Sequence, residues 1–177
     1  MANKVERVLE SINNELGNEI YNNLISKVGT IGDKPTPAKQ GKYMKILLDE
    51  LSLNYGVEAT KKIMRPCGYQ CISNTAINTA KLLHKKYDNI EDFLNILNEN
   101  HIGGGYLHIK DNKIIAIYDK CYCGIPKSAK DISSIYCECS VGWFEKLFSS
   151  VFEKEVDVKR IDTILNGADK CTFEITF

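Results

Sequence analysis

The stretch that decides the fold is "GGGYLHIKDNKIIAIYD", residues 103–119, where the periodicity of the chain changes. Apolar and polar residues alternate on both sides of Asp111-Asn112, a pattern typical of a β-hairpin. Before this stretch, apolar residues recur at helical spacing, and near the end of the chain alternation returns. The stretch therefore marks the boundary between a helical half and a sheet-forming half.

Helical spacing dominates the first hundred residues. The predicted helices cover residues 3–28 with an interruption near Gly17, 38–55, a short segment through Ile63 and Met64, 69–87 and 89–100. The short segment is expected to stop at Pro66, because the residue before a proline is disfavoured in a helix. On this prediction Cys71 lies near the start of the next helix.

The last seventy-odd residues predict an antiparallel sheet crossed by one amphipathic helix. After the hairpin come a short strand over 135–140, a helix over 141–155, and two strands around a turn at 166–169. The sequence thus predicts an α+β fold with a helical N-terminal half packed on an antiparallel sheet. We expect a single domain over 1–177, with a helical part at 1–101 and an α+β part at 102–177.

Composition limits the class of protein. The 177 residues suit one domain, and 44% hydrophobic with 26% charged residues indicates a globular chain. Lys+Arg and Asp+Glu are equal at 23 each, which argues against a broad nucleic-acid-binding surface. No apolar run approaches the roughly 18 residues of a membrane span. The charged N-terminus is not a secretory signal. We therefore predict a cytoplasmic protein with no membrane or nucleic-acid partner; its Asn, Lys and Ile content hints at a bacterial source.

The cysteines are the main functional signal. Six of the seven form close pairs, namely Cys67/Cys71, Cys121/Cys123 and Cys137/Cys139. A cytoplasmic chain keeps thiols reduced, and an odd count excludes a complete disulfide framework within one chain. On extended chain each Cys-x-Cys pair would present both sulfurs on one face. If Cys71 opens a helix, the helix dipole and nearby Arg65 would lower thiol pKa values there.

Three interpretations stay open. The six paired cysteines could supply a soft-metal site, with four thiolates around zinc as the default and an iron–sulfur cluster as the alternative. Cys67 or Cys71 could instead be a nucleophilic or redox-active thiol, with Asp119 or Glu138 as acid, base or supporting group. In the third interpretation, cysteines simply pack in the core. This last interpretation is favoured for Cys171, which alternates with Phe173 and Ile175.

The C-terminal part, residues 102–177, resembles a known family. A hairpin after glycines, "CSVG", an amphipathic helix and the closing "NGADKCTFEITF" resemble the 4-vinyl-reductase-like domain and the related L-2-amino-thiazoline-4-carboxylate hydrolase-like family. The most specific pattern is Gly-x-Asp-x-Cys-x-Phe-x-Ile, residues 167–175. The resemblance implies an α+β fold around a pocket for a small aromatic or heterocyclic molecule.

The resemblance also implies a zinc ligand at Cys171. Where zinc-binding members carry two further ligands, this chain has Thr163 and Arg160, so the three cysteine pairs would have to hold any metal here.

These observations predict a small-molecule-binding protein with a cysteine-rich, metal-binding pocket. As an enzyme it would be a metal- or thiol-dependent hydrolase of a small C–N or C–S compound, with a zinc-bound water as nucleophile. The alternatives are a non-catalytic ligand sensor and a thiol redox or metal-handling protein. The sequence leaves a homodimer open.

Overall fold

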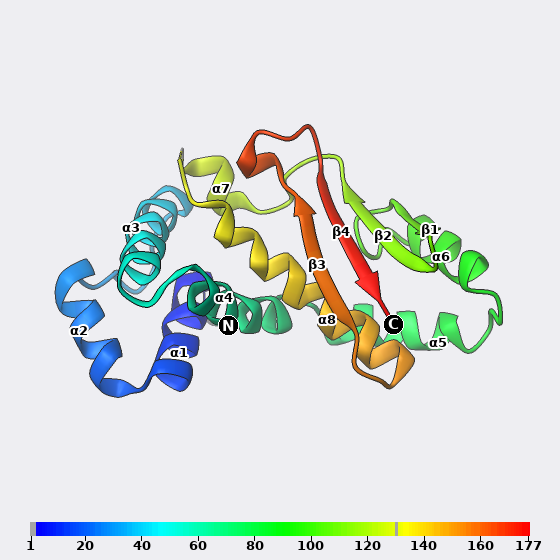
Figure 1. Cartoon of the computed structure of the whole chain (residues 1–177), viewed down its shortest axis with the longest axis horizontal. Coiled ribbons are helices and arrows are strands. Elements are labelled where there is room, and N and C mark those ends of the chain that lie inside the picture. Colours follow the sequence, from blue (N-terminus) through cyan, green and yellow to red (C-terminus); the bar gives the residue numbers. More distant parts are fainter. Residues whose placement is uncertain (1–2, 130) are drawn as a thin grey trace.

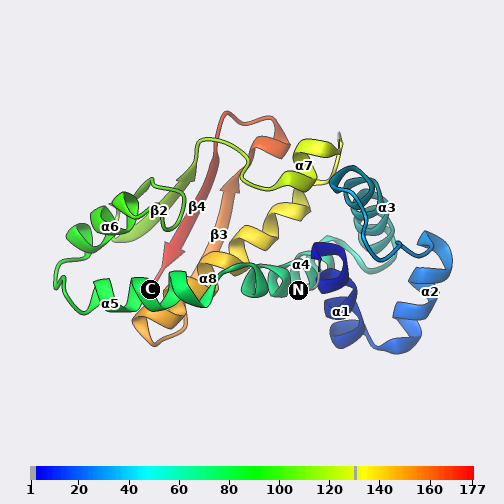
Figure 2. The ribbon, with the colours of Figure 1, turned by 180° about the vertical axis from the view of Figure 1, so that it is seen from behind.

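The computed structural model describes residues 3–129 and 131–177, and Figure 1 shows an elongated molecule with a helical end and a sheet end. Helices α1–α3 gather at one end, and α5 and α6 lie with the sheet at the other (Figures 1 and 2). The first six helices are α1 (Lys4–Leu16), α2 (Asn18–Val28), α3 (Pro37–Tyr55), α4 (Val57–Cys71), α5 (Asn74–His84) and α6 (Ile90–Glu99).

The later elements form the sheet and the helix that crosses it. They are β1 (Leu107–Lys110), β2 (Lys113–Tyr118), α7 (Gly124–Ser128), the 3-10 helix η1 (Ser134–Cys137), α8 (Glu138–Phe152), β3 (Asp157–Asp162), the 3-10 helix η2 (Ile164–Asn166) and β4 (Cys171–Thr176). The strand order is β1-β2-β4-β3, and every pairing is antiparallel. The predicted α+β fold is therefore confirmed, including the long crossing helix.

The hairpin turns where the sequence predicts. Lys110 pairs with Lys113, and Asp111 and Asn112 between them have φ values of 50° and 58°. Asp and Asn tolerate this left-handed conformation better than most residues. On the closing strand Cys171, Phe173 and Ile175 are buried on one face, as predicted.

The predicted end of a helix at Pro66 is wrong. Helix α4 continues through Pro66 to Cys71, and the chain breaks instead at Ile72-Ser73, where the Ser73 hydroxyl caps α5 by accepting from the Ala76 N–H at 3.1 Å. The predicted helix over 69–87 is thus the end of α4 plus α5. Tertiary packing outweighs the local cost of a proline here, because α4 lies tightly against α8.

The predicted strand over 135–140 is also wrong. These residues form η1 and the first turn of α8. Ile135, Tyr136 and Cys139 are all buried, and their spacing of one and three residues fits a helical face better than one side of a strand. Six residues of alternation are too few to separate the two periods.

Two hydrophobic clusters make up the core. One joins α5, α6 and α8 to the sheet through Phe93, Phe144, Phe148 and Phe173. The other joins α1–α4 to η1 and includes Cys67 and Cys139. Helix α8 contributes to both clusters; the single-domain organisation stays a prediction. No described helix is long and apolar enough to cross a membrane.

Candidate functional site

Helices α4 and α8 touch backbone to backbone at two glycines. A Cβ at Gly68 would clash with the carbonyl oxygen of Cys139, and a Cβ at Gly142 would clash with that of Arg65. Only glycine permits such an approach between helices. The close crossing fixes the last turns of α4 against the first turns of α8.

This crossing gathers three thiols. Cys67 and Cys71 lie one turn apart near the end of α4, and Cys139 lies in the first turn of α8. The three Sγ atoms all lie within 4.8 Å of one another; we name these residues the thiol triad. Tetrahedral thiolates around one zinc ion lie about 3.8 Å apart, given bonds of about 2.3 Å. The triad could therefore hold one metal ion after small movements of the side chains.

The charge next to the triad comes from α1. Cys71 does not open a helix as predicted but ends α4, where the helix dipole is negative. Instead, Arg7 Nη1 donates to Cys71 Sγ at 3.1 Å, and Lys4 Nζ donates to Cys123 Sγ at 3.2 Å and to Cys139 Sγ at 3.8 Å. Two cations one turn apart on α1 thus face thiols from three other segments.

These contacts set which thiol ionises. The pKa of Cys71 is lowered by hydrogen bonds from Cys139 and Cys67 and by the charges of Lys4 and Arg7. The pKa of Cys67 is raised, because it donates within the same set and is buried. Although burial lowers the pKa of Lys4, attraction to Cys139 and Cys123 outweighs it and raises that pKa. The lowered pKa favours the thiolate form at Cys71, and the raised pKa of Lys4 keeps its ammonium charged.

A pocket of about 380 Å³ opens beside the triad. Its walls come from α1, the end of α4, β2, the segment after β2, η1 and α8. The lining residues are Lys4, Cys71, Tyr118, Cys121, Tyr122, Cys123, Pro126, Tyr136, Cys137, Cys139, Ser140 and Trp143. Five of the six paired cysteines line this one pocket, and the sixth, Cys67, contacts it through the triad. The three pairs therefore converge, and their binding of a metal stays a prediction.

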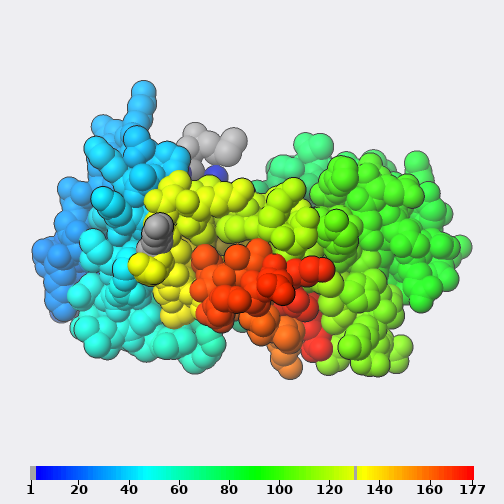
Figure 3. Space-filling model, turned by 90° about the horizontal axis from the view of Figure 1, so that it is seen from above, coloured from blue at the N-terminus to red at the C-terminus, as the bar shows by residue number. Residues whose placement is uncertain are grey.

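The segment between β2 and α8 forms the outer wall. In Figure 3 this yellow-green to yellow segment runs across the upper face, beside the orange-red turn between β3 and β4. Cys121 and Cys123 lie on its extended first part, as predicted, and both are half-buried. Cys123 Sγ lies 2.9 Å from the hydroxyl of Tyr136 and shares Lys4 with the triad. Cys123 is thus the thiol best placed to join the triad.

The remaining thiols lie further from the cations. Burial and the neighbouring Cys171 raise the pKa of Cys137 to about 12. Cys171 is buried in the sheet, where its Sγ accepts from the Ile164 N–H at 3.4 Å. Burial raises its pKa as well. These two thiols are in the protonated form at neutral pH.

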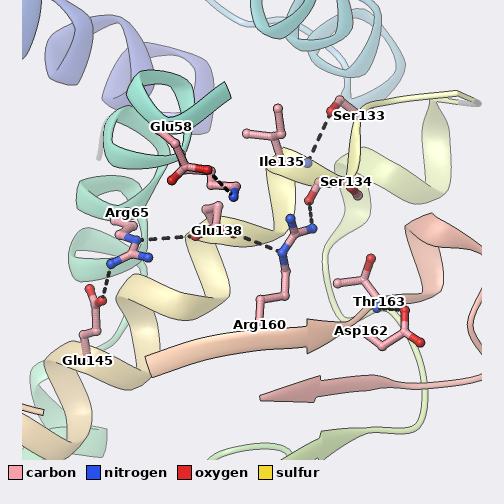
Figure 4. A network of polar contacts seen from close by, with 11 residues as sticks. Glu58, Arg65, Ser133, Ser134, Ile135, Glu138, Glu145, Arg160, Asp162 and Thr163 are labelled. Atoms are coloured by element: carbon pink, nitrogen blue, oxygen red, sulfur yellow. Dashed lines mark hydrogen bonds and ion pairs between the residues drawn. The ribbon is translucent and has the colours of Figure 1, made fainter. Parts of the chain in front are cut away.

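The two carboxylates proposed as acid or base lie outside the pocket lining. Glu138 is buried and accepts from Arg65 at 3.4 Å and from Arg160 at 3.0 Å, as Figure 4 shows. Asp119 is exposed and accepts from the Tyr122 hydroxyl at 3.1 Å. Arg65, which was expected to act on the thiols, binds Glu138 and Glu145 instead. This placement gives a catalytic role of Glu138 or Asp119 no support.

Sequence reasoning missed the two cations and the two glycines. Lys4 and Arg7 are two of many charged residues on a helix, and nothing local distinguishes them from an exposed face. Gly68 and Gly142 carry a usable signal, because a glycine inside a helical pattern often marks a close approach. Each lies within three residues of a cysteine, in "CGYQC" and "CSVG".

We compared the chain with curated proteins, solved structures and protein-family models. No curated protein matches the chain. Among solved structures, a point mutant of an H-NOX domain from Shewanella oneidensis, solved by NMR in the Fe(II)CO ligation state, is 15% identical over 100% of this chain and 98% of that chain, with a TM-score of 0.47.

The resemblance to the 4-vinyl-reductase-like and L-2-amino-thiazoline-4-carboxylate hydrolase-like families is wrong, because a different family model matches the whole chain. Residues 167–175 form the turn that ends the 3-10 helix η2, a bend and most of the half-buried strand β4. The matching model covers residues 1–177 and is described as a family of unknown function, DUF6144, and the chain belongs to this family.

Proposed function

We propose that the protein is a non-catalytic small-molecule-binding module whose pocket is built on a soft-metal site at Cys67, Cys71 and Cys139. The observation that carries this proposal is the spacing of the triad, with all three Sγ atoms within 4.8 Å, at the edge of a 380 Å³ pocket. Thiolate donors select soft or borderline metals, and zinc is the default among them. Lys4 and Arg7 offset the negative charge that three thiolates would gather.

A binding role fits the pocket better than hydrolysis. Among the described residues, no Asp, Glu or His lines it. A metal-bound water would therefore have no carboxylate or imidazole beside it to take a proton. The lining instead offers aromatic rings and thiols around a space of the size that holds small ligands.

The direct test is a titration of the reduced, chelator-treated protein with zinc or cadmium. We expect about one equivalent to bind, and Cys67→Ser to weaken the affinity at least about tenfold by removing one thiolate. Cys121→Ser is the matched control, because Cys121 lines the pocket but lies outside the triad. Failure of the wild-type protein to bind either ion would refute the metal site.

A second candidate, a reactive thiol, rests on Cys71. Its pKa is lowered, it is half-buried at the pocket wall, and Arg7 donates to its sulfur at 3.1 Å. Such a thiolate attacks disulfides and other soft electrophiles. Metal and thiol chemistry are distinguished by adding zinc: a metal site predicts that bound zinc protects Cys71 from iodoacetamide.

A further inference from the structure

Two cations lie at the pocket beside the triad, and no described acidic side chain lines the pocket to balance their charge. Lys4 lines it, and Arg7 contacts Cys71 at its edge. Neither cation has a carboxylate within ion-pair distance among the described residues, and no described acidic residue lines the pocket. Their described polar contacts are with cysteine sulfur. The Lys4 ammonium also lies 5.5 Å from the centroid of the Tyr136 ring. A half-buried ammonium whose described partners are sulfur atoms and an aromatic ring is available to a stronger acceptor.

Charge balance gives the sign of that acceptor. Three triad thiolates with one divalent ion carry a net single negative charge, and Lys4 with Arg7 add two positive charges. The sum is one positive charge in a partly buried space, which a single anionic group would neutralise. Charge-assisted hydrogen bonds from an ammonium to an anion are among the stronger polar contacts in proteins.

The pocket lining also includes an aromatic part. Tyr118, Tyr122 and Trp143 line the same pocket as Lys4. Tyr118 and Tyr122 meet edge to face with ring centroids 5.2 Å apart, and Trp143 meets Phe144 in the same way at 5.2 Å. These contacts hold the rings in place, so the lining offers preformed aromatic surface rather than flexible side chains.

We propose that the pocket binds a small aromatic monoanion, with its anionic group at Lys4 and its ring against the side chains of Tyr118, Tyr122 and Trp143. This inference rests on the proposed function in that it names the ligand class of the same pocket. A volume of about 380 Å³ is enough for a single substituted ring.

The test uses three probes of one size and different charge: benzoate, benzyl alcohol and benzylamine. Each is titrated calorimetrically into the zinc-loaded protein. We expect benzoate to bind at least about tenfold more tightly than benzyl alcohol, and benzylamine to bind least, because only benzoate gains the ammonium contact. Equal affinities for the three probes, or no binding of benzoate, would overturn the inference.

Two variants and one control locate the effect. Lys4→Met keeps the length of the side chain and should abolish the preference for benzoate, whereas Lys42→Met, an exposed change on α3, should leave it intact. Trp143→Leu should weaken benzoate and benzyl alcohol alike. Preference retained in Lys4→Met would count against the assignment.

The titrations distinguish a protein that binds no zinc from a pocket that has no preference for an anionic ligand. If zinc does not bind, the same titrations on the metal-free protein decide the inference, because Lys4 lines the pocket without metal. If zinc binds and the probes show no charge preference, the metal site stands and the ligand class is wrong.

Discussion

Glu138 and Cys139 are neighbours at the start of α8, yet they belong to two different kinds of polar cluster. Around Glu138 every charge is paired: Arg160 and Arg65 contact its two oxygens at 3.0 and 3.4 Å, and Arg65 also contacts Glu145 at 2.8 Å. Around Cys139 the described side-chain hydrogen bonds of Lys4 and Arg7 all go to sulfur, Lys4 also lies over the Tyr136 ring, and both cations adjoin a pocket. We refer to these as the closed network and the open cluster.

The difference distinguishes a structural cluster from a candidate binding cluster at the start of the same helix, α8. A buried carboxylate whose partners are complete is costly to disturb and offers nothing to a ligand. Beside the pocket, the thiols keep unused capacity for a metal ion, and the cations that face them keep unused capacity for an anion. A buried acid beside a cysteine is therefore weak evidence of catalysis unless its oxygens remain available.

Breaking the closed network should produce the largest loss of stability. Glu138→Gln removes the negative charge between Arg65 and Arg160 and leaves two cations facing a neutral amide. We expect the free energy of unfolding to fall by about 3 kcal/mol, measured by urea denaturation. The control is Glu58→Gln, whose exposed pair with Lys61 at 2.7 Å is screened by solvent and should cost far less. Equal effects of the two changes would mean that the network is not the stabilising unit.

Separating α4 from α8 should damage the open cluster and stability together. Gly68→Ala places a methyl group against the backbone of α8, so we expect a loss of about 2 kcal/mol in unfolding free energy and at least about tenfold in zinc affinity. Gly124→Ala at the start of α7 meets nothing within 4 Å and serves as the control. A stable Gly68→Ala protein with unchanged zinc binding would show that the crossing does not set the thiol geometry.

Cys71 in the open cluster and Cys137 outside it should differ in reactivity, although both line the pocket and are half-buried. The pKa of Cys71 is lowered, whereas burial raises that of Cys137 to about 12. In the metal-free protein at pH 7, iodoacetamide should therefore modify Cys71 at least about tenfold faster. Between pH 7 and 9 the rate at Cys71 should stay flat, while that at Cys137 should rise with pH. Peptide mass spectrometry separates the two sites, and similar rates would contradict the assigned thiolate.

The smallest effect is expected at the outer edge of the closed network. Burial, and then the hydrogen bond to Glu145 at 2.8 Å, raise the pKa of Tyr69 to about 12. Glu145→Gln should lower this pKa, while the burial contribution persists, and should cost less than about 1 kcal/mol in stability. Ultraviolet titration of tyrosinate measures the shift, with Tyr69→Phe identifying the signal. An unchanged titration would remove Glu145 from the causes.

The sequence predicts the parts of the fold that local pattern controls. The interruption at Gly17, the turn at Asp111-Asn112 and the buried face of β4 all follow from periodicity and turn chemistry. The errors at Pro66 and at 135–140 share one cause. Both segments take their structure from the crossing of α4 with α8, and that contact joins residues some seventy positions apart.

The same contact explains what could be foreseen of the site. The density of cysteine pairs marked these residues as a possible site, because residue type is visible in a sequence, but it left open whether the pairs converge. Which thiols form the triad depends on how α4 and α8 cross. The local sequence pattern does not determine this crossing. The contacts of Lys4 and Arg7 with the thiols could not be predicted for the same reason, because they depend on where α1 packs in the tertiary structure.

Helix α8 has a consequence for how the molecule would transmit a binding event. Its first turn belongs to the core around α1–α4, and its later turns, from Val141 to Val151, belong to the core around the sheet. A metal ion bound by Cys139 and the cysteines of α4 would hold α8 against α4. Because α8 belongs to both cores, we expect the two cores to unfold together, in one thermal transition, when the site is filled.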